Sequence, residues 1–112
     1  KNIVEVGAGY GAMCIVMDSI YNFDKYTIVD LPPVVELNKK YLKNFPEIYS
    51  KVQFIECNNL DSYNQEKIDL FISDAALSEC DLETQLSYFN TFVKNGSGNV
   101  CSLILFSFLY KY

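Results

Sequence analysis

Three glycines at alternate positions near the start of the chain are the residues whose spacing points most clearly to chemistry. Gly7, Gly9 and Gly11 come directly after Ile3–Val6, a run that is rich in β-branched residues and contains Glu5. Glycine has no Cβ and adopts backbone conformations that other residues avoid, so a ligand can lie against the bare backbone of such a turn. The N–H groups there, and the positive end of a following helix, attract polar ligand groups. The stretch therefore predicts a ligand-binding turn between a strand and a helix.

Two kinds of ligand suit such a turn, and Glu5 distinguishes between them. Taken as G-x-G-x-x-A, Gly7 to Ala12 matches a dinucleotide fingerprint, in which the helix N-terminus faces a pyrophosphate. A carboxylate two residues before the first glycine would repel that anion and would favour a ligand with positive charge. We therefore prefer a cationic ligand, while a dinucleotide and a glycine turn without any ligand stay open as alternatives.

Asp30 is the second candidate for ligand binding. It ends the apolar run Tyr26–Val29 and lies 19 residues beyond Gly11. An acid at the tip of a second strand can hydrogen-bond both hydroxyls of a ribose. The alternative is a carboxylate that caps the helix after Leu31-Pro32-Pro33.

Two further acids, Asp74 and Glu79, follow the apolar run Ile68–Ile72. The carboxyl ends of parallel strands meet at one edge of a sheet, so this loop is expected to face the glycine turn. Both acids are therefore candidates for catalysis. Ser78 or Asp81 has an alternative role as the cap of the next helix.

The elements that must position these residues alternate between apolar strands and helical periodicities. Strands are expected at residues 3–6, 26–29, 51–56, 68–72 and 100–106. Three helices lie between them, with expected buried faces of Met13, Val16, Met17 and Ile20; Val34, Leu37, Tyr41 and Leu42; and Leu82, Leu86, Phe89 and Val93. The pattern predicts an α/β fold: a Rossmann-like three-layer sandwich with a mainly parallel sheet of order 3-2-1-4-5 that is truncated after strand 5.

Composition narrows the function classes. The 112 residues allow one domain over 1–112, which we expect to be an excerpt of a longer chain, because it begins without Met and ends on a strand. A net charge of −5 argues against nucleic acid as a ligand, and no apolar run is long enough to span a bilayer. The absence of histidine excludes serine–histidine and cysteine–histidine catalysis. Four dispersed cysteines suggest core residues in a reducing, cytoplasmic protein.

Three segments together resemble a bacterial family of sugar O-methyltransferases, within the class I S-adenosylmethionine-dependent methyltransferases. They are Ile3-Val4-Glu5-Val6-Gly7-Ala8-Gly9-Tyr10-Gly11, Tyr26-Thr27-Ile28-Val29-Asp30-Leu31-Pro32 and Asp69-Leu70-Phe71-Ile72-Ser73-Asp74-Ala75-Ala76-Leu77-Ser78-Glu79. The glycine motif is specific only for the superfamily. The Asp-Leu-Pro and Ala-Leu-Ser-Glu segments are what suggest the sugar-acting branch. An asparagine is usual in that family where Asp74 stands here, so the chain departs from the pattern at this position.

The resemblance implies S-adenosyl-L-methionine as the cofactor and a sugar or nucleotide-sugar hydroxyl as the methyl acceptor. The residues that it places around the cofactor are Glu5, Gly7, Ala8, Gly9, Tyr10, Gly11, Asp30, Leu31, Asn58, Asn59, Leu60 and Asp74. Asp74, Glu79 or Tyr10 would take the acceptor's proton, and no metal site is expected. An NAD(P)-binding oxidoreductase fragment and a non-catalytic module with the same fold remain alternative functions.

Overall fold

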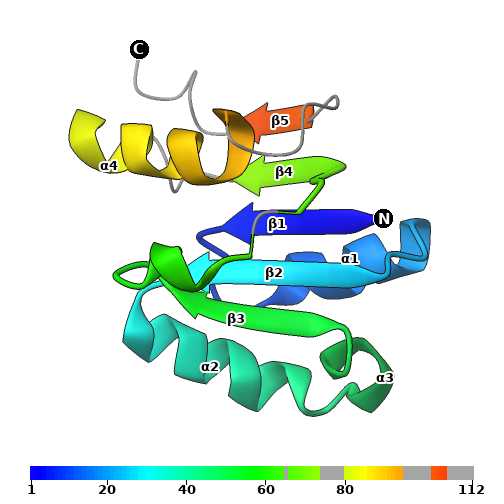
Figure 1. The fold of residues 1–112 in the computed structure, drawn as a ribbon. Helices are drawn as coiled ribbons and strands as arrows, with labels where there is room; N and C mark the ends of the chain where they lie inside the picture. The colour runs from blue at the N-terminus through cyan, green and yellow to red at the C-terminus, as the bar shows by residue number, and fades with distance from the viewer. Residues whose placement is uncertain (65, 74–79, 95–101, 106–112) are drawn as a thin grey trace.

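A parallel β-sheet forms the centre of the computed structural model, which describes residues 1–64, 66–73, 80–94 and 102–105. Its strands are β1 (Asn2–Val6), β2 (Lys25–Asp30), β3 (Val52–Glu56), β4 (Leu70–Ser73) and β5 (Ser102–Leu105). They lie side by side in the order β3-β2-β1-β4-β5, and every neighbouring pair is parallel (Figure 1). The predicted parallel sheet is therefore confirmed, with the order 3-2-1-4 for its first four strands.

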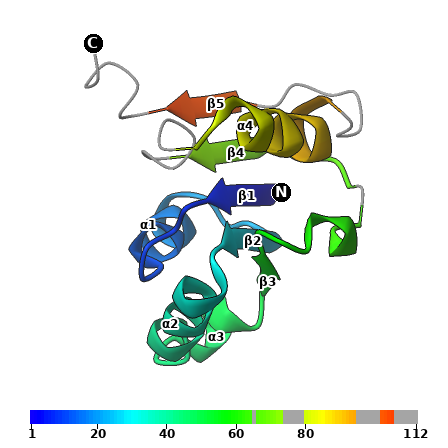
Figure 2. The ribbon, with the colours of Figure 1, turned by 90° about the vertical axis from the view of Figure 1, so that its left-hand side faces the viewer.

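Helices cover both faces of the sheet. One layer holds α1 (Ala12–Ile20), α2 (Pro32–Leu42) and the short α3 (Pro46–Tyr49). The 3-10 turn η1 (Leu60–Ser62), α4 (Leu82–Tyr88) and its π-helical continuation η3 (Phe89–Lys94) lie on the opposite face (Figure 2). The arrangement is a three-layer α/β sandwich. Within the described residues, no helix combines the length and the apolar character needed to cross a membrane.

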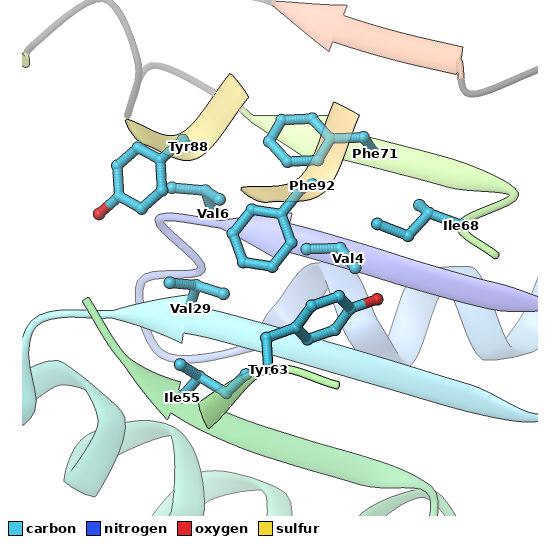
Figure 3. Close-up of a cluster of buried hydrophobic side chains, with 9 residues drawn as sticks. All are labelled: Val4, Val6, Val29, Ile55, Tyr63, Ile68, Phe71, Tyr88 and Phe92. Carbon is cyan, nitrogen blue, oxygen red and sulfur yellow. The ribbon is translucent and has the colours of Figure 1, made fainter. Parts of the chain in front are cut away.

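Two apolar clusters join these layers, because successive side chains of a strand point to opposite faces. Val4 and Val6 of β1 pack with Phe71, Tyr88 and Phe92 on the α4 face (Figure 3). On the other face, the cluster comprises Ile3, Cys14, Met17, Phe23, Tyr26, Ile28, Leu42 and Ile72. All five residues of β1 are buried, so β1 is covered on both sides and fixes where the glycine turn begins.

The buried faces of α1 and α2 differ from the predicted ones. In α1, Met17 is buried as expected, but Val16 and Ile20 are exposed. In α2, Leu37 is exposed. The residues that the two helices bury are Cys14 and Met17 in α1, and Val35, Asn38 and Leu42 in α2. Residues 13–17 of α1 are all apolar, and five consecutive residues point to every side of a helix. The sequence pattern therefore does not determine which side of α1 faces the sheet.

The predicted face of α4 is also wrong. Leu82, Leu86 and Phe89 are exposed by 70%, 50% and 45%, while Tyr88 and Phe92 are buried. The side chain of Val93 lies outside the described residues. Tyr88 and Phe92 are one helical turn apart, and large aromatic rings bury more apolar area than leucines do. The helix therefore packs through its aromatic side.

Asp81 begins α4 as its N-cap, as the alternative interpretation of that residue expected. Its side chain accepts a hydrogen bond of 2.8 Å from the backbone N–H of Thr84. This bond holds the pKa of the Asp81 carboxyl below its usual value.

Candidate functional site

The glycine turn connects β1 to α1 at the carboxyl edge of the sheet. Gly7, Gly9 and Gly11 have φ angles of 80°, 58° and 107°, all in the region that favours glycine. The N–H of Gly7 donates to the carbonyl of Val29 (2.9 Å), and the N–H of Gly11 donates to the carbonyl of Ala8 (3.0 Å). Both ends of the turn are thus fixed by backbone hydrogen bonds, and the predicted connection of a strand to a helix through these glycines is confirmed.

Gly9 and Gly11 face different surroundings. A Cβ at Gly11 would lie 3.3 Å from the side chain of Leu42, so packing between the turn and α2 requires glycine there. A Cβ at Gly9 would meet no described atom within 4 Å beyond its chain neighbours. Gly9 is also exposed. The space next to Gly9 is therefore open, and a ligand can approach the backbone at this point.

The N-terminus of α1 adjoins this open space. Gly11 is its N-cap and makes no side-chain capping bond, and the first turn carries no acidic residue. The N–H groups of the first turn of a helix have no partner within the helix, and its dipole is positive there. The turn therefore offers donors and a partial positive charge to an oxygen-bearing group.

Glu5 belongs to β1, two residues before the turn, and its side chain interacts with Tyr26 of β2 and Cys14 of α1. It is only 2% exposed, and its Oε1 accepts a hydrogen bond of 2.6 Å from the hydroxyl of Tyr26. Burial, together with the charge of Glu5, raises the pKa of Tyr26, which keeps the hydroxyl protonated as a donor. The pKa of the Cys14 thiol is raised to about 12, mainly by burial and to a lesser extent by the carboxylate of Glu5. Glu5 is thus a buried carboxyl group close to the turn, held by the hydroxyl of Tyr26.

Asp30 ends β2 immediately beside the turn, because Val29 is paired with Val6 in the parallel register. Its side chain is half-buried, and Oδ1 accepts a hydrogen bond of 2.8 Å from the N–H of Leu31. The carboxylate makes no capping bond to α2, whose N-cap is Leu31. Within the described residues, this carboxylate makes no other hydrogen bond. Leu31 itself is 58% exposed and adds an apolar surface next to Asp30.

The residues after β3 lie along the same edge of the sheet. The N–H of Cys57 donates to the carbonyl of Asp30 (2.8 Å), which brings this loop next to the end of β2. Asn58 and Asn59 are exposed, and Leu60 is half-buried against the apolar cluster on the α4 face. The structure therefore places these three predicted residues beside Asp30, where amide groups and an apolar surface are available.

Tyr88 is a residue at this edge that the sequence analysis missed. It is 6% exposed and its ring stacks on that of Phe92. Figure 3 shows Tyr88 beside Val6, with its hydroxyl pointing away from the rest of the cluster. Burial raises the pKa of this hydroxyl, and electrostatic interactions with Cys57, Cys80 and Asp30 raise the pKa further. Only its spacing from Phe92 in the sequence hinted that Tyr88 faces the sheet.

Of the three candidates for proton transfer, the structure describes Tyr10 alone. Tyr10 is 53% exposed, and its ring makes an edge-on contact with Tyr41 of α2 at 5.0 Å. Asp74 and Glu79 lie outside the described residues. The structure therefore brings together the glycine turn, Glu5, Asp30, Leu31 and Asn58 to Leu60 at one edge, while the roles of Asp74 and Glu79 stay predictions.

No protein-family model matches the sequence, and no curated protein matches it. Solved structures match it at the level of the fold. A candidate caffeoyl-CoA O-methyltransferase from Staphylococcus aureus superposes with a TM-score of 0.74 at 20% identity, over 98% of this chain and 51% of its own. The glycopeptide N-methyltransferase MtfA, complexed with sinefungin, gives 0.70 at 14% identity, over 93% of this chain and 45% of its own.

The mitomycin 7-O-methyltransferase MmcR is similar to the same extent. It gives a TM-score of 0.69 at 17% identity, over 93% of this chain and 30% of its own. The chain thus spans about a third to a half of the lengths of these three structures. The fold is thus shared with proteins named as methyltransferases of different acceptors. This chain therefore has the class I methyltransferase fold.

Proposed function

We propose that this protein is an S-adenosylmethionine-dependent methyltransferase. The observation that carries the proposal is the open backbone at Gly9, in a turn that begins beside the end of β2, at the carboxyl edge of a sheet with the methyltransferase fold. In open α/β sheets, ligands bind outside the carboxyl ends of the strands, where the strand order reverses. That reversal lies between β1 and β4 in this chain, and the glycine turn follows β1.

The residues present at this edge fit the cofactor group by group. The backbone of residues 7–11 holds the amino-acid part, and the charge of Glu5 favours its cationic groups. Asp30 has a carboxylate oxygen left for the ribose hydroxyls, since only its contact with Leu31 is made within the described residues. Leu31 and residues 58–60 offer an apolar surface and amide groups to the adenine.

When bound, S-adenosylmethionine would supply a methyl group on a positively charged sulfur, so that an acceptor oxygen can bond to the methyl carbon as the carbon–sulfur bond breaks and S-adenosylhomocysteine leaves. The protein's part is chiefly to hold and orient the reacting groups, and alignment of this kind can remove about 7–11 kcal/mol of a barrier. An acceptor hydroxyl must also lose its proton, for which Asp74, Glu79 and Tyr10 are the candidates in a chain without histidine.

A pyrophosphate suits the site less well than a cation does. The carboxylate of Glu5 is buried close to the turn, so its repulsion of a phosphate would be weakly screened by water. The site therefore favours S-adenosylmethionine over NAD(P) as the ligand. We further propose a sugar or nucleotide-sugar hydroxyl as the acceptor, on the basis of the Asp-Leu-Pro and Ala-Leu-Ser-Glu segments.

Asp30 provides the test of the cofactor site. Asp30→Ala should weaken the binding of S-adenosylhomocysteine, measured by calorimetric titration, by about 10- to 100-fold, the value of hydrogen bonds to a charged group. Glu56→Gln is the matched control, because Glu56 is the half-buried neighbour of Asp30 in the sheet register. Equal affinities for the two variants would contradict the proposed site.

The acceptor class is tested separately. The protein should transfer a labelled methyl group from S-adenosylmethionine to at least one nucleotide-sugar in a panel that also contains phenols and amines. Transfer confined to phenols or amines would overturn the sugar proposal and leave the cofactor proposal intact.

A further inference from the structure

Asn38 is an anomaly on the buried face of α2. It lies between Val35 and Leu42, one helical turn from each, and like them it is essentially inaccessible to solvent. A buried amide destabilises a protein unless its polar atoms form hydrogen bonds. In Asn38, the Nδ2 group donates to the backbone carbonyl of Gly9. The polar residue on this helix face thus contacts the backbone of the proposed cofactor-binding turn.

The other half of the amide has no such partner. Within the described residues, Oδ1 of Asn38 is buried and forms no hydrogen bond. The side chain is therefore only half satisfied, and leucine, which has the same branching with methyl groups in place of the amide atoms, would suit this apolar position better. A purely structural role for Asn38 does not explain an amide at this position.

Gly9 needs an external contact to define its orientation. Backbone hydrogen bonds fix the turn at Gly7 and at Gly11, but apart from Gly9 and its chain neighbours no described atom lies within 4 Å of where a Cβ of Gly9 would be. Packing therefore does not restrain Gly9, whose φ of 58° is one of several that glycine adopts easily. The bond from Asn38 supplies the missing restraint.

This restraint determines which backbone groups face outward. In a trans peptide the C=O of one residue and the N–H of the next point in opposite directions, and the described backbone has no cis peptide bonds. Because the carbonyl of Gly9 points to Asn38 on α2, the N–H of Tyr10 points away from α2. Asn38 thus turns a donor of the glycine turn outward and an acceptor inward.

We propose that Asn38 is a positioning residue, which orients the Gly9–Tyr10 peptide for cofactor binding through its hydrogen bond to the Gly9 carbonyl. The inference rests on the proposed function, since the cofactor is the ligand of this turn. Asn38 itself does not touch the cofactor in this account.

The test separates affinity from stability. Asn38→Leu should keep or raise the melting temperature of the protein and weaken binding of S-adenosylhomocysteine by about tenfold, which corresponds to one lost hydrogen bond. Val35→Ala is the matched control: it removes buried volume from the same helix face, so it should lower the melting temperature and leave the affinity within about twofold. If leucine overpacks the site, Asn38→Ala is compared with Val35→Ala in the same way.

Binding by Asn38→Leu with the affinity of the unmodified protein would overturn the inference. A second measurement does not depend on the cofactor. In the ligand-free protein, Asn38→Leu should shift the amide NMR signals of Gly9 and Tyr10, while those of β2 stay unchanged. If the unmodified protein binds no S-adenosylhomocysteine, the proposed function fails, and unchanged signals at Gly9 and Tyr10 would show separately that the positioning role is wrong.

Discussion

Gly9 and Gly11 are both glycines with positive φ angles, yet they serve different purposes. Gly11→Ala adds a Cβ 3.3 Å from Leu42 at a φ of 107°, so we expect it to lower the free energy of unfolding by about 2–5 kcal/mol. Gly9→Ala has open space and a φ of 58°, which other residues tolerate at about 1–2 kcal/mol. Urea denaturation of both variants measures the difference.

Binding should follow the opposite order. The Cβ of Gly9→Ala occupies the space that the cofactor needs, so this variant should lose most of its affinity for S-adenosylhomocysteine while it stays folded. The smaller stability loss would then accompany the larger affinity loss. Wild-type affinity in Gly9→Ala would show that the open space next to Gly9 does not hold the ligand.

The pair of Glu5 and Tyr26 allows a prediction about stability. Tyr26→Phe removes the hydroxyl that donates to the buried Glu5 carboxylate, and should lower the free energy of unfolding by about 1.5–3 kcal/mol, the value of a hydrogen bond to a charged group. Tyr49→Phe is the control, since the Tyr49 hydroxyl makes no hydrogen bond within the described residues and the change should stay within about 0.5 kcal/mol. Equal stabilities of the two variants would mean that the Tyr26 hydroxyl does not support Glu5.

At the scale of elements, the sequence predicted the strands well and the helix faces poorly. Val4 and Val6 belong to a β-branched run, and their burial on the α4 face follows from the alternation of a strand. In α1 and α4, by contrast, apolar residues occupy more than one side of the helix. Which side is buried depends on the fit with the sheet, and this fit does not appear in the local pattern.

The observed packing of α4, which differs from the predicted one, can be checked with two substitutions. Phe92→Ala should lower the free energy of unfolding by about 3–5 kcal/mol, because it empties a fully buried position between Tyr63, Phe71 and Tyr88. Leu86→Gln should change it by less than about 0.5 kcal/mol, because Leu86 is half exposed. Thermal and urea denaturation measure both changes. A larger loss of unfolding free energy in Leu86→Gln than in Phe92→Ala would contradict the observed packing.

At the scale of the whole molecule, the sheet topology assembles the site from segments that are far apart in sequence. The glycine turn and Asp30 could be predicted, because each is a local motif at the end of a strand. Tyr26, Asn38 and Tyr88 could not, since each reaches the site from another element: Tyr26 of β2 to Glu5, Asn38 of α2 to Gly9, and Tyr88 of α4 to the Cys57 and Asp30 edge. Side-chain contacts between such distant elements leave no periodic signal in the sequence.

The central claim is that the carboxyl edge beside Gly9 binds S-adenosylmethionine rather than a dinucleotide. Calorimetric titration of the unmodified protein with S-adenosylhomocysteine, and in parallel with NADH, tests it most directly. The account predicts saturable binding of one S-adenosylhomocysteine per chain, which NADH does not displace. Binding of NADH without binding of S-adenosylhomocysteine would contradict the claim and would identify the glycine turn as a pyrophosphate site.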